Sequence, residues 1–201
     1  MSRTSKRDEL IEAAIRLFNR HGYRATGVDR LMEETGIAKT TLYRHFATKE
    51  DLIVAALARV DEQAREELRA FVEAASDDPR ERILATFDWL DSWLTDSEFN
   101  GCPFVAAAAE YGSVRDAVFQ QVLLHKRLTL AYFEELVRAA RIPHPRSVAR
   151  QLVMLQEGAV AYAQVLGHES VASEARAAAE RLIHDPVDAR SGSTREGGSA
   201  G

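Results

Sequence analysis

Apolar side chains recur at spacings of three and four along most of the chain, which is the period of an α-helix, and no stretch shows strand-like alternation. Turn-forming glycine, proline and asparagine residues interrupt the pattern at intervals. We therefore expect an all-α fold of about nine helices. The pattern predicts them over residues 8–21, 26–35, 39–46, 49–75, 79–94, 104–111, 114–141, 146–166 and 171–184.

Residues 26–51 combine two short helices, a turn at Gly36 and a basic second helix rich in hydroxyl groups. Thr26 is expected to cap the first short helix, with Asp29 three positions on, and Thr48 and Asp51 are expected to form a similar cap on the long helix that follows. Cations and hydroxyls gathered on one short helix suit DNA phosphates and base edges. These residues therefore predict a helix-turn-helix that binds DNA.

The distribution of charge supports this division of the chain. The 201 residues carry a net charge of -5 and are 46% hydrophobic, enough apolar content to bury a core. Residues 1–51 hold 10 basic and 8 acidic side chains, a net +2, whereas the remainder holds 16 and 23, a net -7. A basic head on an acidic body is consistent with a protein that places one end on DNA.

Neither cysteine content nor hydropathy indicates secretion or a membrane. The chain has one cysteine, which excludes an internal disulfide, and its N-terminus lacks a signal-peptide pattern. No apolar run reaches the roughly 18 residues that a membrane-spanning helix needs. We expect a cytoplasmic protein with no membrane partner.

Three regions follow from these patterns. Residues 1–48 are predicted to form the head, a DNA-binding domain of three helices, and residues 49–184 the body, an effector-binding and dimerisation domain. The helix over 49–75 would span about 40 Å and connect the two. Residues 185–201 are rich in Ser, Gly, Arg and Glu, which predicts a disordered tail.

The last two helices of the body carry apolar stripes with small residues between them, so that a partner helix could approach closely. Two such helices from each of two chains would form a four-helix bundle; the alternative is that both pack only within their own chain. The predicted interface of a homodimer consists of Leu152, Leu155, Gly158, Ala159, Tyr162, Leu166, Ala175, Ala178 and Leu182.

The run TGVDRLMEETGIAKTTLYRHFATKEDL resembles the tetracycline-repressor (TetR) family of bacterial transcription regulators over about a quarter of the chain. A weaker similarity to a subset of that family lies in Gly101-Cys102-Pro103-Phe104 with Glu110-Tyr111. The resemblance implies that the third helix enters the major groove of an operator. By position, it implies base contacts from Lys39, Thr40 and Arg44, and phosphate contacts from Thr26, Thr41, Tyr43, His45 and Lys49.

The resemblance also implies that the body binds a small-molecule effector in a largely apolar cavity, with no cofactor. Aromatic residues and a few polar groups near them are the candidates, although core packing is the alternative for each aromatic and a satisfied core histidine for His125. The predicted lining consists of Phe87, Trp93, Cys102, Phe104, Glu110, Tyr111, His125, Tyr132 and Gln156.

The function expected from the resemblance is that of a repressor released from a palindromic operator by its effector. An activator, or a DNA-binding protein without an effector, is the alternative. A remote alternative is a hydrolase with Cys102 as nucleophile, His125 as base and Glu110 as the residue that orients it. No glycine-rich elbow accompanies Cys102 and no pair of residues has metal-ligand spacing, so we expect neither an enzyme nor a metal site; a redox role for Cys102 stays open.

Overall fold

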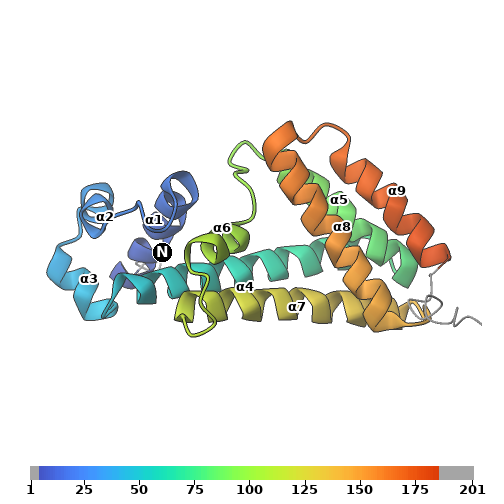
Figure 1. Ribbon diagram of the computed structural model, residues 1–201, viewed down its shortest axis with the longest axis horizontal. Helices are drawn as coiled ribbons and strands as arrows, with labels where there is room; N and C mark the ends of the chain where they lie inside the picture. Colours follow the sequence, from blue (N-terminus) through green and yellow to red (C-terminus); the bar gives the residue numbers. More distant parts are fainter. Residues whose placement is uncertain (1–4, 186–201) are drawn as a thin grey trace, which may run out of the picture.

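The computed structural model describes residues 5–185, which form nine α-helices and no strand (Figure 1). The predicted all-α fold is confirmed. The predicted disordered tail, residues 185–201, lies outside the described residues apart from Asp185. The helices are α1 Lys6–His21, α2 Val28–Thr35, α3 Lys39–His45, α4 Lys49–Ala75, α5 Pro79–Leu94, α6 Pro103–Glu110, α7 Ala117–Ala139, α8 Pro145–Leu166 and α9 Val171–His184.

Helices α1 to α3 form the head at one end of the long axis (Figure 1). Leu10 and Ile11 of α1 are buried against Leu31 of α2 and Leu42 of α3, as the apolar pattern predicts. Gly36 closes α2 with φ of 64°, a left-handed conformation that glycine adopts without a steric penalty. The turn lets α3 leave the head core at a new angle and present its other face to solvent.

The two predicted caps had different outcomes. Thr48 and Asp51 form the reciprocal capping box at the start of α4, as predicted. The prediction for Thr26 is wrong, because the N-cap of α2 is Gly27, without a side-chain cap hydrogen bond. Thr26 is instead fully buried, and its hydroxyl donates to the carbonyl of Gly22 at 2.7 Å, which ties the link to the end of α1.

Helix α4 is the connection between head and body. Its 27 residues correspond to about 40 Å at the helical rise, and α7 runs beside it along the body (Figure 1). Helices α5, α8 and α9 pack on one another at the end of the molecule opposite the head. A shift of the side chains between α4 and α7 therefore has a direct structural route to the head.

The core of the head continues into the body. Phe104, Ala107 and Tyr111 of the α6 region, with Val118 and Val122 of α7, belong to the same buried cluster as the residues of α1 to α4. A second cluster fills the space among α4, α5, α7, α8 and α9. Helix α6 thus packs with the head although it lies after α5 in sequence, and a domain boundary after residue 48 stays a prediction.

Candidate functional site

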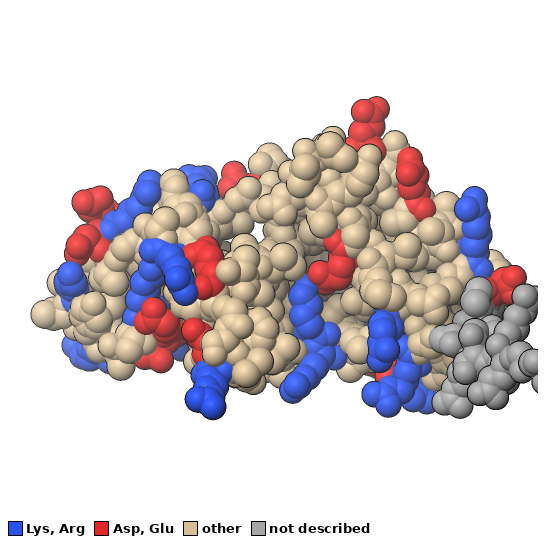
Figure 2. All heavy atoms as spheres, in the orientation of Figure 1, with Lys and Arg blue, Asp and Glu red and all other residues tan. Residues whose placement is uncertain are grey.

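Helix α3 presents a polar face to solvent. Lys39, Thr40, Tyr43, Arg44 and His45 are exposed, and Tyr43 keeps 47% of its surface. Leu42 is buried in the head core and fixes which face points outward. In Figure 2 Lys and Arg side chains lie over the head with acidic ones between them, so the basic groups are interspersed rather than forming a uniform field.

Three predicted DNA contacts already have partners within the chain. Lys39 Nζ lies 2.9 Å from Asp29 Oδ1, and this pairing raises the pKa of Lys39, which keeps the ammonium charged. Lys49 Nζ donates to the carbonyl of Arg24 at 3.2 Å, and its partial burial lowers its pKa. The buried side chain of Thr26 does not reach the surface, so this structure does not support its predicted phosphate contact. Thr41 is half-buried on the flank of α3.

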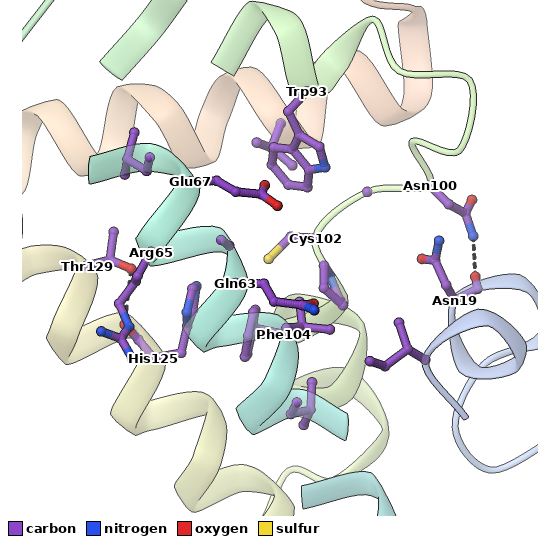
Figure 3. A pocket seen from close by; sticks show the side chains of 18 of the residues that line it. Asn19, Gln63, Arg65, Glu67, Trp93, Asn100, Cys102, Phe104, His125 and Thr129 are labelled. Carbon is purple, nitrogen blue, oxygen red and sulfur yellow. Dashed lines mark hydrogen bonds between the residues drawn. The ribbon is translucent and has the colours of Figure 1, made fainter. Parts of the chain in front are cut away.

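A cavity of about 340 Å³ lies between the head and the body. Helices α4, α5, α7 and α8, the residues around the start of α6, and the inner side of α1 form its wall. Figure 3 shows the arrangement, with Cys102 and Phe104 between α4 and the segment that leads to Asn100. Its size and its mixture of aromatic, aliphatic and polar side chains suit a small molecule.

A buried ionic group organises one side of this cavity. Asp61 of α4 is 3% exposed, and its carboxylate accepts hydrogen bonds from His125 Nδ1 at 2.7 Å and from Arg65 Nε at 3.1 Å. The ring of His125 stacks on Phe104, with centroids 3.5 Å apart and planes 5° from parallel. Burial lowers the pKa of His125 although Asp61 opposes the change, so the imidazole is neutral at pH 7 and its Nδ1–H donates to the carboxylate. Helices α4, α6 and α7 are joined at this point.

Five of the nine predicted lining residues line the cavity: Trp93, Cys102, Phe104, His125 and Gln156. The other four lie elsewhere. Phe87 is 1% exposed in the body core and does not line the cavity. Tyr132 lies further along α7, under the guanidinium of Arg69 at 4.2 Å.

Glu110 and Tyr111, the remaining two, face the head. The Glu110 carboxylate accepts hydrogen bonds from the backbone amides of Tyr23 at 2.9 Å and Arg24 at 2.6 Å. Tyr111 is buried in the head core, with the guanidinium of Arg24 5.3 Å above its ring. The C-terminal end of α6 therefore holds the link between α1 and α2, and neither of these two residues lines the cavity.

Sequence reasoning missed Asp61, Arg65, Glu67, Lys126 and Glu157, which supply the charges in and around the cavity. One signal was available for Asp61. It lies four residues after Leu57 and seven before Leu68, on the buried stripe of α4, where an unpaired acidic residue would be costly. The others belong to long polar side chains on partly exposed faces, and sequence alone does not distinguish those from solvated residues.

The residues of the remote hydrolase alternative are not assembled as that alternative requires. Cys102 and His125 line the same cavity, but the partner of His125 is Asp61, and Glu110 binds the head. Lys126 Nζ lies 3.7 Å from Cys102 Sγ and 2.5 Å from Glu157 Oε1. Among residues 5–185 no group of three or more His, Cys, Asp and Glu side chains is arranged to hold a metal ion, and no described helix is long and apolar enough to cross a membrane.

The outer face of α8 exposes large apolar side chains toward its C-terminal end. Tyr162 is 56% exposed, Leu166 68% and Val165 80%. A groove between α8 and α9 is lined by Met154, Leu155, Gly158, Ala159, Tyr162, Val171, Ala175 and Ala178 with two glutamates. Of the predicted interface, Leu152 is fully buried inside its own chain, Ala159 is 6% exposed in the groove wall, and Leu182 packs on the body core outside the groove. Met154 and Val165 join this surface and were not predicted.

The geometry agrees with the matches to known families. Residues 10–56 match the family described as bacterial regulatory proteins, tetR family, and residues 79–179, half of the chain, match the tetracyclin repressor-like C-terminal domain. The chain belongs to the TetR family. TetR-family proteins are DNA-binding transcriptional regulators, and the suggestion from the helix-turn-helix motif is thereby confirmed.

Individual TetR-family relatives are similar over different extents. The crystal structure of SCO4454 from Streptomyces coelicolor is 31% identical, with a TM-score of 0.79, over 89% of this chain and 96% of that one. The regulator LmrA of Bacillus subtilis is 35% identical over 55% of this chain and 59% of its own. The transcriptional activator FasR of Mycolicibacterium smegmatis is 28% identical over 61% of each. The match thus covers less than two thirds of these two regulators.

Proposed function

We propose that this TetR-family protein is a homodimeric repressor that binds a palindromic operator through α3 and leaves it when a small molecule fills the cavity. The observation that carries the proposal is the position of the cavity. It lies against Phe104 at the start of α6, and the other end of α6 holds the head through Glu110. A ligand there contacts the element that fixes the orientation of α3.

The DNA contacts we propose are the exposed groups of α3, namely Lys39, Thr40, Tyr43, Arg44 and His45, with Thr41 and Lys49 at its edges. Arginine and lysine match the two major-groove acceptors of guanine, and hydroxyl groups suit phosphate oxygens. Because basic and acidic groups alternate on the head, one head supplies modest electrostatic affinity. Tight binding therefore requires two heads held at a fixed spacing.

The route from cavity to DNA runs through two helices. Phe104 stacks on His125, and Tyr23 Oη donates to the carbonyl of Pro103 at 3.0 Å, so the start of α6 contacts both the cavity and the end of α1. A ligand that displaces Phe104 moves α6 relative to α4. The ligand shifts the population only if it binds the DNA-free form more tightly, and the α6 displacement supplies that difference.

The decisive experiment is a DNA gel-shift with the promoter region of this gene, at two salt concentrations. We expect salt-sensitive binding, and we expect Arg44→Ala to weaken it by roughly tenfold or more through a lost base contact. Tyr43→Phe should weaken it less. Arg127→Ala changes an exposed arginine of α7 on the body and should leave binding unchanged. Equal binding by the wild type and Arg44→Ala would contradict the proposal.

An activator is the second candidate, because FasR, similar over 61% of this chain, is named as one. The two functions share the operator and the dimer and differ in the sign of the response. A reporter fused to the bound promoter separates them. Deletion of the gene should raise expression from that promoter for a repressor and lower it for an activator.

A further inference from the structure

The charges in the cavity wall indicate the sign of its ligand. Arg65, on α4, is paired with the buried carboxylate of Asp61 at 3.1 Å. Lys126, on α7, is paired with Glu157 of α8 at 2.5 Å. Each cation in the described lining is thus neutralised by a carboxylate of the protein, and neither is a free partner for an anionic ligand.

The acidic side chains of the wall are in excess. Glu98 is paired with Arg20 at 3.5 Å, in an exposed position at the edge of the cavity. Glu67, also in the lining, is an exposed residue with no ion pair and no hydrogen bond among the described residues. The wall of the cavity therefore carries one uncompensated negative charge, on α4.

Glu67 points into the cavity. In Figure 3 its carboxylate extends from α4 toward Trp93 and Cys102, whereas Arg65, two residues earlier on α4, extends toward Thr129 and His125. The two charges of α4 therefore lie toward different parts of the cavity. The guanidinium of Arg65 does not neutralise the carboxylate of Glu67 across the cavity.

The surface opposite Glu67 is aromatic. Trp89 and Trp93, one turn apart on α5, stack with centroids 6.1 Å apart, and Phe99 meets Trp93 edge-on at 5.3 Å. The faces of indole rings carry the negative end of the ring quadrupole and attract cations. A carboxylate and two indoles around an apolar space form an environment that favours a positive charge on a hydrophobic body and disfavours a carboxylate or phosphate.

We propose that the cavity binds a small lipophilic cation, an ammonium or aromatic iminium group on a planar apolar body, with its charge between Glu67 and Trp93. The apolar part would lie against Val60, Leu68 and Phe104. The release of DNA by such a cation rests on the function proposed above, whereas its binding does not. His125 adds no charge that would repel it, since burial keeps the imidazole neutral.

Three probes of one shape test the proposal: N-methylquinolinium, its neutral isostere 1-methylnaphthalene, and the anion naphthalene-1-carboxylate. The only two tryptophans of the chain are Trp89 and Trp93, and both line the cavity, so quenching of their fluorescence reports occupancy directly. Calorimetric titration of the full-length protein supplies the affinities independently. We expect the cation to bind most tightly and the anion most weakly.

Matched variants assign the preference to one carboxylate. Glu67→Gln keeps the shape of the side chain and should weaken binding of the cation by about fivefold while leaving the neutral probe unchanged, as expected for a charge pair made by an exposed carboxylate. Glu66→Gln removes the neighbouring exposed charge, which lies outside the cavity lining, and should change neither. Circular dichroism checks that both variants retain their helix content.

Each outcome bears on the ligand class. Equal affinity for cation and neutral probe, tighter binding of the anion, equal effects of Glu67→Gln on all probes, or no binding of any probe up to its solubility limit would overturn the proposed ligand class. A gel-shift with promoter DNA is read separately. If the cation binds through Glu67 but DNA stays bound, the ligand class stands and the proposed release fails. If instead the anion binds more tightly and releases DNA, the ligand class fails and the proposed release stands.

Discussion

At the scale of single residues, the buried carboxylate of Asp61 connects side chains of α4 and α7. Two partners from different helices share it, His125 and Arg65, and the stack of His125 on Phe104 extends its influence to α6. A carboxylate that is 3% exposed has lost most of its hydration, so removal of either partner would leave a costly buried charge. Substitution of Asp61 should therefore change both the stability of the protein and the shape of the cavity.

Asp61→Ala should lower the free energy of unfolding by about 3 kcal/mol, because it leaves the Arg65 guanidinium and the His125 N–H without their acceptor. Asp61→Asn keeps one acceptor oxygen and should cost less. Urea unfolding followed by circular dichroism measures both. A loss for Asp61→Ala no larger than that for Glu66→Ala, an exposed neighbour, would contradict this role.

Acidification should also destabilise the protein through His125. The folded-state pKa of His125 lies below its ordinary value of about 6.5, so below that pH the unfolded chain binds more protons than the folded one. The contribution of neutral His125 to the free energy of unfolding is present above about pH 6.5 and is lost as the pH falls toward the folded-state pKa. Melting temperatures between pH 7.5 and 5.5 should fall more for the wild type than for His125→Gln; parallel curves would refute this.

At the scale of elements, α6 is a connector between cavity and head. It begins beside Phe104 in the wall of the cavity and ends at Glu110, whose carboxylate holds two amides of the α1–α2 link. Gly22 at the start of that link has φ of 82°, and a Cβ there would lie 3.1 Å from Glu110 Oε1. A small residue able to adopt a positive φ is therefore required where the carboxylate approaches the backbone.

Glu110→Ala should loosen this contact. We expect faster hydrogen exchange at the amides of Tyr23 and Arg24, and a loss of about 1–3 kcal/mol in the free energy of unfolding for unsatisfied donors. Glu110→Gln retains an acceptor oxygen and should fall between Glu110→Ala and the wild type. Glu135→Ala, which removes a carboxylate from the surface of α7, serves as the control. Unchanged exchange in Glu110→Ala would show that α6 does not hold the link.

The sequence predicted the elements far better than the contacts between them. The starts of α4 and α5 were placed at Lys49 and Pro79 because Thr48 with Asp51, and Pro79, are local signals. Lining residues depend on how helices pack in space. Phe87 and Trp93 both follow the helical period of α5, but only the completed bundle determines which of them reaches the cavity.

Pairings across long separations were equally inaccessible from sequence. Asp61 and His125 are 64 positions apart, and Glu110 and Tyr23 are 87 apart. No spacing rule links such pairs, since they depend on the way α6 and α7 return to the head. By contrast, the outward face of α3 could be predicted, because Leu42 and Phe46 alone fix its inner side.

At the scale of the whole molecule, α3 lies at one end of the long axis, whereas the exposed apolar side chains of α8 belong to the body (Figure 1). A surface with Tyr162, Val165 and Leu166 more than half exposed is larger than single scattered apolar residues and is typical of an interface. Pairing of these faces in two chains would set the distance between two copies of α3. The spacing between operator half-sites would then be a property of the dimer.

Val165→Glu should disrupt the proposed homodimer, because it places a charge in an apolar contact where it loses hydration. Light scattering at micromolar concentration should show a monomer mass for this variant and a dimer mass for the wild type. Val114→Glu, at an exposed valine before α7, is the matched control and should remain dimeric. DNA affinity should fall with the dimer. A monomeric wild type would contradict the proposed assembly.

The cavity shares no residue with the exposed face of α3 or with the groove between α8 and α9. Even on α8 the two surfaces are separate, since Gln156, Glu157 and Val160 face inward while Gly158, Ala159 and Tyr162 line the outer groove. Under the proposed function, substitutions in the cavity that change the ligand therefore need not change the operator that α3 binds or the interface between two chains. Natural or laboratory selection could then change the ligand specificity while the operator stays the same.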